Sequence, residues 1–458
     1  MSSLSLMLLI LGLGIIGWII GRGRARALAL VSPEKHHSLP TQHGWYVALW
    51  TIAPALLFLA VWGQASNGLI DASVMADPAA QSLSGDAMSR DSILGEARSL
   101  ADGSLEAAFN PAAEALAKPY ASAIRHYGII GAAAALLLAF AGAAYGWTRI
   151  RPDFRARTRV EHLVMMALLA ASMIAVLTTF GIVASLLYES GRFFSMVSPA
   201  EFLFGLKWSP QAELVAGQDN GFGALPLFWG TIFIGAIIAM IVAIPLGLMS
   251  AIYLTQYAAA TTRKWMKPTL EMLAGVPTVV YGYFAALTVA PVVRDFAGLL
   301  GMENPSSESA LAAGLVMGIM IIPFVSSMAD DSIAAVPQAM RDGSLALGAT
   351  KSETIRRVLV PAALPGIVGG VLLAVSRAIG ETMIVVMAAG LAANMTANPF
   401  ASVTTVTTQI VQLLTGDQEF DSAKTLAAFA LGLVLFIVTL LLNIVALRVV
   451  KKYREAYE

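Results

Sequence analysis

Two charged residues, Arg377 and Glu381, interrupt a strongly apolar run, LLAVSRAIGETMIVV (residues 372–386). No other charged residue lies within ten positions of either one. In a continuous helix, residues four apart share a face and can pair. An arginine also offers a planar fork of N–H donors that suits an oxyanion such as phosphate. Two interpretations therefore stay open: a buried ion pair that fixes the helix, and a cation on the path of an anion.

The functional interpretation gives the two residues different roles. If the helix enters the membrane at Pro365, Arg377 lies about 18 Å along it. A charge at that depth costs between ~3 and more than 10 kcal/mol and must face protein or water. A bare arginine would trap an anion, so a competing glutamate keeps binding weak. Phosphate at pH 7 also carries at least one proton, through which it can donate a hydrogen bond to Glu381, whereas sulfate carries none. We therefore expect Glu381→Gln to assemble normally but to alter transport of such an anion.

The composition is that of a membrane protein. Of 458 residues, 57% are hydrophobic and 13% charged, against about 25% charged in soluble domains. The absence of cysteine excludes disulfides, thiolate metal sites and thiol catalysis. The net charge of zero gives no bias toward nucleic acid, and we expect no nucleic-acid partner. Three of the five histidines share one polar segment, EKHHSLPTQH, but no carboxylates organise them, so we expect no metal site.

Nine segments are apolar and long enough to cross a bilayer as helices, which needs about 20 residues each. The first is short, and arginines follow it directly, so it does not have the pattern of a cleaved signal peptide. The predicted spans are 4–20, 45–63, 127–147, 162–187, 227–255, 269–292, 309–329, 365–390 and 425–449.

The distribution of basic residues sets the expected orientation. One set of loops carries 20 lysines and arginines, and the opposite set carries 8. The positive-inside rule places the first set in the cytoplasm. We therefore expect the N-terminus outside and the C-terminus in the cytoplasm, which nine spans satisfy.

The chain is predicted to have two parts that meet near residue 150, at the basic stretch TRIRPDFRARTR. Residues 1–150 hold three spans and a long external segment, 64–126. This segment is rich in alanine, serine and acids, and we expect a short amphipathic helix near Asp91–Phe109 within an otherwise mobile or partner-dependent loop. Residues 151–458 hold six spans and form the working core.

Three prolines lie inside predicted spans of this core: Pro245, Pro277 and Pro323. A membrane proline removes a backbone hydrogen bond, which is tolerated where protein or a water-filled path satisfies the freed groups. We therefore treat them as candidate helix breaks along a pathway, with an ordinary packing kink as the alternative. Gly369, Gly370 and Gly380 are expected to allow close helix packing.

The cytoplasmic loop at about 331–364 has the most informative pattern. Thr350 and Glu353 fit a capping box that opens a short helix, which Pro361 is expected to end. Four apolar residues form a stripe with no evident cover in the chain: Leu345, Leu347, Ile355 and Val358. An exposed stripe indicates a partner protein, and packing against its own membrane domain is the alternative.

This loop resembles the ATPase-docking loop of permease subunits in ABC importers, whose pattern is E-A-A-x3-G-x9-I-x-L-P. The matching residues at the same spacings are Asp342, Gly343, Ser344, Gly348, Val358, Val360 and Pro361. The departures are Asp for Glu, Gly-Ser for Ala-Ala, and Val for Ile and Leu. The acid, the glycine, the apolar character and the proline are kept.

Three further segments narrow the resemblance: LEMLAGVPTVVYGYFAAL, LALGATKSETIRRVLVPAALPGI and SRAIGET. Over about residues 160–458 the chain is similar to phosphate importer permeases, of the PstC rather than the PstA type. The resemblance implies an all-α integral membrane protein. It also implies a six-helix type I permease core that follows a three-helix N-terminal extension. By the same resemblance, Arg377 and Glu381 are expected to act in transport.

The resemblance also implies partners. These are a PstA-like second permease, a PstB-like ATPase dimer and an external PstS-like phosphate-binding protein, in a bacterial cytoplasmic membrane whose lipid surrounds the chain. The chain has no GxxxxGK[ST] and no Gly-Lys dipeptide, so it lacks a P-loop. We expect a non-catalytic subunit without a bound cofactor, in which ATP is used by the partner ATPase.

Three alternatives remain open from the sequence. The first is a permease for another oxyanion, such as sulfate, molybdate or phosphonate. The second is a transporter that needs no ATPase, although the cytoplasmic loop argues against it. The third is a membrane scaffold or sensor whose loop binds a regulator.

Overall fold

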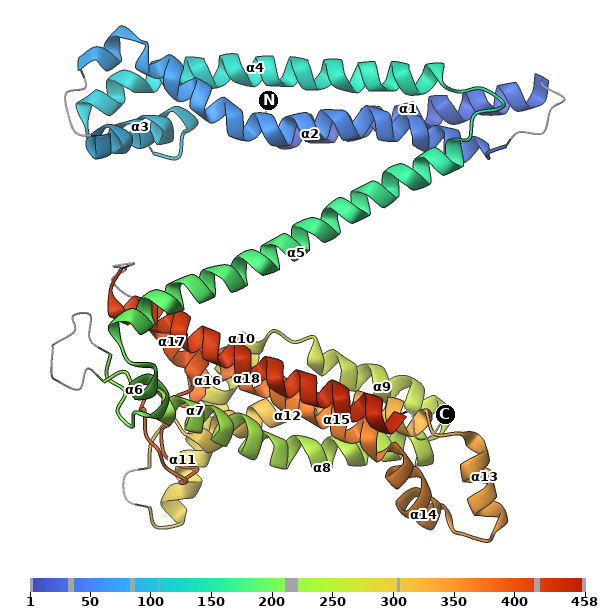
Figure 1. The fold of residues 1–458 in the computed structure, drawn as a ribbon, viewed down its shortest axis with the longest axis vertical. Helices are drawn as coiled ribbons and strands as arrows, with labels where there is room; N and C mark the ends of the chain where they lie inside the picture. Colours follow the sequence, from blue (N-terminus) through green and yellow to red (C-terminus); the bar gives the residue numbers. More distant parts are fainter. Residues whose placement is uncertain are drawn as a thin grey trace. The chain divides into compact units, whose positions relative to one another are not determined.

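The computed structural model describes residues 3–31, 37–82, 87–105, 107–210, 221–302, 305–415 and 421–454. These residues form helices and connecting segments, with a single isolated β-bridge between Trp208 and Phe222 (Figure 1). Within them, nine helices are long and apolar enough to cross a membrane, which confirms the predicted all-α membrane fold. The nine are Leu4–Leu30, Pro40–Met75, Pro111–Thr148, Ala156–Met196, Leu225–Tyr257, Thr278–Leu299, Ala310–Ala334, Lys351–Ile379 and Ala423–Lys452.

The chain divides into two compact units, Met1–Leu177 and Thr178–Glu458. The division falls inside helix α5 (Ala156–Met196), later than the boundary near residue 150 expected from the sequence. The basic stretch before α5 leads directly into this 41-residue helix, so it begins a helix that both units share.

Unit 1 is built on three long helices, α1 (Ser3–Val31), α2 (Pro40–Met75) and α4 (Pro111–Thr148). Small residues let them approach closely, as in many membrane helix pairs. A Cβ added at Gly142 of α4 would overlap the Trp50 carbonyl of α2, and one at Gly44 of α2 would lie 2.7 Å from the Trp18 carbonyl oxygen of α1. These glycines therefore allow the helices to pack backbone against backbone.

Segment 64–126 of unit 1, predicted to be external, is folded over the residues that the structure describes, where the sequence predicted a mobile or partner-dependent loop. Helix α2 continues to Met75, a 3-10 turn η1 spans Pro78–Ser82, and α3 spans Ala87–Asp102. They pack on the start of α4 through one apolar cluster that includes Ile70, Val74, Ala97, Leu116 and Tyr120. The expected helix at Asp91–Phe109 is present but ends at Asp102, because Gly103 adopts a left-handed conformation with φ of 81°.

Unit 2 is centred on α12 (Ala310–Ala334), since 61% of its most apolar stretch is buried. Gly314 and Gly318 face Ile238 and Val242, which brings the preceding Leu225–Tyr257 helix close. That helix joins α7 (Leu225–Thr231), a π-helical turn η2 (Ile232–Ile238), α8 (Ala239–Ile252) and a second π turn η3 (Tyr253–Tyr257).

The other elements of unit 2 surround this centre. The second long helix joins α10 (Thr278–Phe284), the π turn η4 (Ala285–Val289) and α11 (Ala290–Leu299). Helix α18 (Ala423–Arg454) packs along α15 (Val360–Ile379). Shorter helices connect the spans: α6 (Pro199–Phe204), α9 (Ala260–Ala274), α13 (Gln338–Ala346), α14 (Lys351–Thr354), α16 (Met383–Ala388) and α17 (Val406–Leu414).

Two of the three prolines do not break their helices. Pro245 lies inside α8 and Pro323 inside α12, so the expected breaks at these positions are absent. Pro323 is buried in the packed centre, where neighbouring helices support the interrupted ladder. Pro277 does separate two helices, with extended dihedrals (φ −56°, ψ 134°) between α9 and α10.

The predicted span 365–390 is displaced toward the N-terminus. The helix begins at Lys351, passes through Pro361 and Pro365, and ends at Ile379. Residues Gly380–Thr382 are not helical, and α16 follows as a separate short helix. The apolar pattern continues across this break, which is why the sequence suggested one span.

Candidate functional site

The first candidate site is the segment from α13 to α14, which projects from unit 2 at the end that also holds the C-terminus (Figure 1). Helix α13 ends in a Schellman motif: the Gly348 N–H donates to the Leu345 carbonyl at 3.0 Å, and the Ala349 N–H to the Ser344 carbonyl at 3.2 Å. Gly348 has φ of 85°, a conformation that favours glycine. The glycine of the docking pattern therefore makes the turn between the two helices.

The predicted capping box at the start of α14 is present. The Thr350 N–H donates to Glu353 Oε2 at 2.9 Å, and the Glu353 N–H donates to Thr350 Oγ1 at 3.3 Å. The hydroxyls of Ser344 and Thr354, 3.0 Å apart, tie α13 to α14. The prediction that Pro361 ends this helix is wrong. A π-helical turn η5 (Ile355–Leu359) ends two residues before the proline, and this wider turn accommodates the ring within a helix that continues to Ile379.

The apolar stripe of this segment is covered at one end only. Ile355 is buried at 5% exposure and Val358 is half-buried, so these two pack within unit 2. Leu345 and Leu347 are 42% and 91% exposed. Asp342 and Gly343 beside them are also exposed, and Val360 is half-buried. The docking surface that remains open is thus α13 and its C-terminal turn.

The second candidate site is the helix break after Arg377. Because α15 ends at Ile379, Arg377 and Glu381 do not share a helix face, and the interpretation as an intrahelical ion pair is wrong. The Glu381 carboxylate instead accepts from the Met383 N–H at 3.1 Å and caps α16. Arg377 is exposed, and within the described part of the chain it has neither an ion pair nor a hydrogen bond.

Buried threonines line the inner side of this break, at the N-terminus of α17. The Thr407 hydroxyl donates to the Glu381 carbonyl at 2.8 Å, and the Thr405 hydroxyl lies 3.0 Å from that of Thr408. The Val406 N–H donates to Thr231 Oγ1 at 3.1 Å, which joins α17 to the helix that contains η2. The run VTTVTTQ is visible in the sequence, but it has no spacing that marks it as a site.

The π turn η2 approaches the same break. A Cβ added at Gly235 would lie 3.2 Å from the Ala378 carbonyl oxygen, next to Arg377. π turns inside α-helices occur frequently at functional sites. The break therefore presents one unpaired guanidinium outward, with hydroxyl groups, a helix N-terminus and a widened helix turn behind it. Such an arrangement can attract an oxyanion without enclosing it.

A cluster of charged side chains that the sequence did not indicate lies near the C-terminal end of α12. Asp330 is 3% exposed and accepts from Arg263 Nη2 at 3.1 Å and from Lys267 Nζ at 2.6 Å, both on α9. The hydrogen bond to this carboxylate raises the pKa of Lys267 above its ordinary value. The amine therefore stays charged at neutral pH, and the group fastens α9 to α12.

Two family profiles match the chain. Residues 7–178 match the family described as "Phosphate ATP-binding cassette transporter". Residues 243–455 match the family described as "Binding-protein-dependent transport system inner membrane component". The first match covers the three N-terminal spans, for which the sequence suggested no role.

Curated relatives carry similar descriptions. The probable ABC transporter permease protein YqgH of Bacillus subtilis is 33% identical over 245 residues, covering 54% of this chain and 75% of that protein. The phosphate transport system permease protein PstC of Mesorhizobium japonicum is 32% identical over 307 residues, covering 64% and 88%. PstC of Haemophilus influenzae is 30% identical over 328 residues, covering 68% and 96%.

Solved structures with a related arrangement include a bacterial ABC transporter involved in the import of the acidic polysaccharide alginate. It has a TM-score of 0.42 and 13% identity, and the match covers 64% of this chain and 99% of that chain. The MetNI methionine ABC transporter in inward-facing conformations has a TM-score of 0.36 and 18% identity, with 49% and 93% covered.

Proposed function

The chain belongs to the PstC family of multi-pass ABC-importer permeases of the inner membrane, and on this premise we propose that it carries inorganic phosphate into the cell. The observation that carries the proposal is Arg377, an unpaired and exposed guanidinium at the break after α15. An unpaired charge on a membrane helix is costly unless another chain, water or an anion faces it. A PstA-like second permease would cover this surface and enclose a path along which phosphate meets the arginine.

In this mechanism Arg377 binds the anion and the surrounding groups limit how tightly. Its guanidinium offers donors to the phosphate oxygens and needs no proton transfer. Glu381 accepts a hydrogen bond from the Met383 N–H, which holds it at the edge of the break. Its other carboxylate oxygen can accept a hydrogen bond from the O–H of hydrogenphosphate. An anion without a proton would meet only repulsion there, which favours phosphate over sulfate.

The energy for transport comes from another chain. We propose that α13 docks on a PstB-like ATPase dimer, with Leu345 and Leu347 filling an apolar groove and the Gly348 turn fixing the angle to α14. ATP hydrolysis in that dimer would move the permease pair between outward-open and inward-open states, and this chain binds no cofactor. An external PstS-like protein would deliver phosphate. The N-terminus faces outside and the C-terminus the cytoplasm.

Uptake of labelled phosphate tests the proposal. Phosphate-starved cells that lack this chain are re-supplied with it, and uptake is measured with and without excess unlabelled sulfate. We expect restored uptake that sulfate does not reduce. Competition by sulfate would favour the second candidate, a permease for another oxyanion. Failure to restore uptake, with the chain present in the membrane, would contradict phosphate import and would mean that another oxyanion is carried or that the chain is not a transporter.

Glu381→Gln isolates the role of the carboxylate. An amide oxygen can still accept from the Met383 N–H, so α16 stays capped and the variant assembles. The loss of the negative charge weakens the hydrogen bond that the O–H of phosphate donates at this position. Phosphate uptake should therefore fall while the amount of assembled importer stays the same. Unchanged uptake by this variant would remove Glu381 from the mechanism.

Retention of the ATPase tests the docking surface separately. Leu347→Asp places a charge on the most exposed residue of the α13 turn and should abolish co-purification of the ATPase. Leu299→Asp is the matched control, because Leu299 is 86% exposed at the end of α11 (Figure 1). Equal retention by the two variants would exclude α13 as the docking element.

A further inference from the structure

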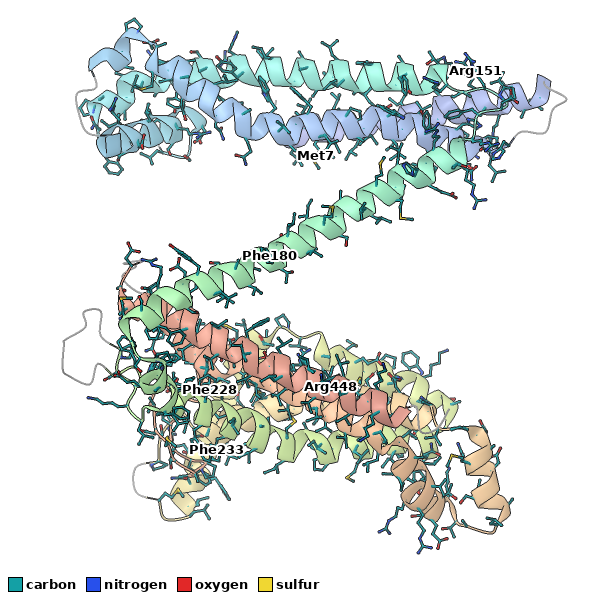
Figure 2. The ribbon with its side chains drawn as sticks, viewed as in Figure 1. Met7, Arg151, Phe180, Phe228, Phe233 and Arg448 are labelled. Atoms are coloured by element: carbon teal, nitrogen blue, oxygen red, sulfur yellow. The ribbon has the colours of Figure 1, made fainter. Side chains whose placement is uncertain are left out.

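One end of unit 1 is strongly basic. It consists of the end of α1, the start of α2, the end of α4 and the start of α5, and Figure 2 labels Arg151 there. Residues 18–31, 37–50 and 142–161 hold eight arginines and two acids. In the part of unit 1 that the structure describes, the ion pair at this end is Arg157 with Glu161, 2.6 Å apart. Most of this positive charge is therefore not neutralised by the residues that the structure describes.

Arg22 differs from the other arginines at this end. Its guanidinium carbon lies 5.1 Å from the centre of the Trp18 ring, one helical turn earlier on α1. Its Nε–H is buried and has no acceptor among the described residues, and the same holds for the indole Nε1–H of Trp18. A buried donor without an acceptor loses its hydrogen bonds to water and gains none in return. Two such donors on adjacent, stacked side chains indicate an acceptor beyond the residues that the structure describes.

The Trp18 ring is held firmly in place. A Cβ added at Gly44 of α2 would lie 3.0 Å from Cδ1 and 3.2 Å from Nε1 of Trp18, so α2 packs directly against the indole. Trp45 contacts the ring edge-on, with centroids 6.2 Å apart. A fixed indole that carries a stacked guanidinium presents its donors in a set geometry, and this lowers the entropy cost of binding.

Neighbouring arginines provide an internal comparison. Arg24 also stacks on a tryptophan, at 4.6 Å from the Trp147 ring, but its Nη1 donates to the Trp147 carbonyl at 3.1 Å. Arg24 thus fastens α1 to the end of α4. Arg26 is exposed to solvent. Arg22 is the half-buried, stacked guanidinium of this group that lacks an acceptor.

We propose that Arg22 and Trp18 bind the phosphate of an anionic phospholipid headgroup. The site lies at the end of helices of membrane-spanning length, where tryptophan and tyrosine collect at lipid interfaces. A phosphodiester offers the oxygen acceptors that the guanidinium and the indole N–H require. Basic segments next to a membrane helix attract anionic lipids, and Arg24, Arg149 and Arg151 add to that field. The lipid thereby becomes a fixed part of unit 1.

Native mass spectrometry of the full-length chain tests this site. The protein is purified in detergent and exposed to phosphatidylglycerol or to phosphatidylcholine, with and without excess inorganic phosphate. We expect one tightly held phosphatidylglycerol that phosphatidylcholine does not replace. In Arg22→Gln its affinity should fall about tenfold, the effect expected for one charge-assisted hydrogen bond. Arg26→Gln removes the same charge from the same helix and should leave this lipid in place.

Further variants separate binding from folding. Trp18→Phe keeps an aromatic ring beside Gly44 but removes the indole N–H, so it should also weaken the lipid. Arg22→Lys keeps the charge and should retain part of the binding. Thermal unfolding in phosphatidylcholine shows whether each variant is folded. Equal loss of lipid from Arg22→Gln and Arg26→Gln would overturn the proposal, as would displacement by inorganic phosphate.

Discussion

Two charged groups in unit 2, Asp330 and Arg377, differ in burial and in the partners that the chain gives them. Asp330 is buried and accepts from two cations, at 3.1 Å from Arg263 and 2.6 Å from Lys267. Arg377 is exposed and has no partner among the residues that the structure describes. The first charge is satisfied within the chain and joins α9 to α12. The second is left for something outside the chain.

The difference teaches which charge to assign to function. A buried charge with partners has a structural explanation that is sufficient, because removing one partner leaves the others uncompensated. An exposed arginine at the end of a membrane helix has the helix dipole as partial support, worth about 0.3–1 kcal/mol. That is too little to explain a cation in an apolar run, so a ligand or another chain must supply the remainder.

The largest expected effect is on transport through Arg377. Arg377→Gln removes the cation and keeps a polar side chain of similar length, so the chain should fold and assemble with its partners. Phosphate uptake should fall at least about tenfold, which is the loss of roughly one charge-assisted hydrogen bond to the anion. Labelled phosphate uptake, normalised to the amount of chain in the membrane, measures this.

The matched control is Arg294→Gln. Arg294 is an exposed arginine of the same unit that pairs with the adjacent Asp295 at 3.1 Å. It should leave uptake unchanged. Equal losses in both variants would mean that arginine charge in general, rather than the position of Arg377, supports transport.

The next effect is on stability through Asp330. Asp330→Ala leaves Arg263 and Lys267 without their acceptor. Both cations are partly exposed, at 40% and 33%, so water can replace some of the lost interaction. We expect a loss of about 1–3 kcal/mol in the free energy of unfolding, measured by thermal unfolding in detergent. Asp331→Ala, at the exposed neighbouring position, should change it little. Equal effects would contradict a specific role for the Asp330 cluster.

Some local signals in the sequence predicted the local structure correctly, although Pro245, Pro323 and Pro361 did not break or end their helices. The turn between α13 and α14 is specified by contacts within a few residues. These are the capping box of Thr350 and Glu353 and the backbone hydrogen bonds around Gly348. The nine spans follow from apolar length, which needs no knowledge of neighbours. These features depend on residues that lie next to each other in the chain, so one sequence is enough to predict them.

Distant contacts explain what the sequence did not show. Asp330 is joined to residues 63 and 67 positions away, and no local pattern marks such a pair. The break after Ile379 lies inside an apolar run, and its free backbone groups are met by residues far along the chain, as when Thr407 donates to the Glu381 carbonyl. The polar external segment was predicted as a loop because its apolar cluster forms only when α2, α3 and α4 meet.

Two glycines of the docking segment can be compared in a similar way, because the backbone conformation favours glycine at Gly348 but not at Gly343. Gly348 adopts φ of 85°, where a side chain costs about 1–2 kcal/mol. Gly348→Ala should therefore strain the turn between α13 and α14 and misplace the docking surface. We expect weaker co-purification of the ATPase and faster proteolysis between residues 338 and 351. Unchanged values would show that the turn tolerates another geometry.

The smallest expected effect has the opposite sign and comes from Gly343, in the middle of α13. An added Cβ there meets nothing within 4 Å, and the helix conformation is ordinary. Alanine is a better helix former than glycine by about 0.5–1 kcal/mol, so Gly343→Ala should stabilise α13. Amide hydrogen exchange across residues 338–346 should slow while phosphate uptake stays the same. Because both variants add one methyl group to the same segment, opposite responses from Gly343 and Gly348 would assign the effect at Gly348 to backbone conformation. Reduced ATPase binding in Gly343→Ala would instead mean that the partner packs against the bare backbone of α13.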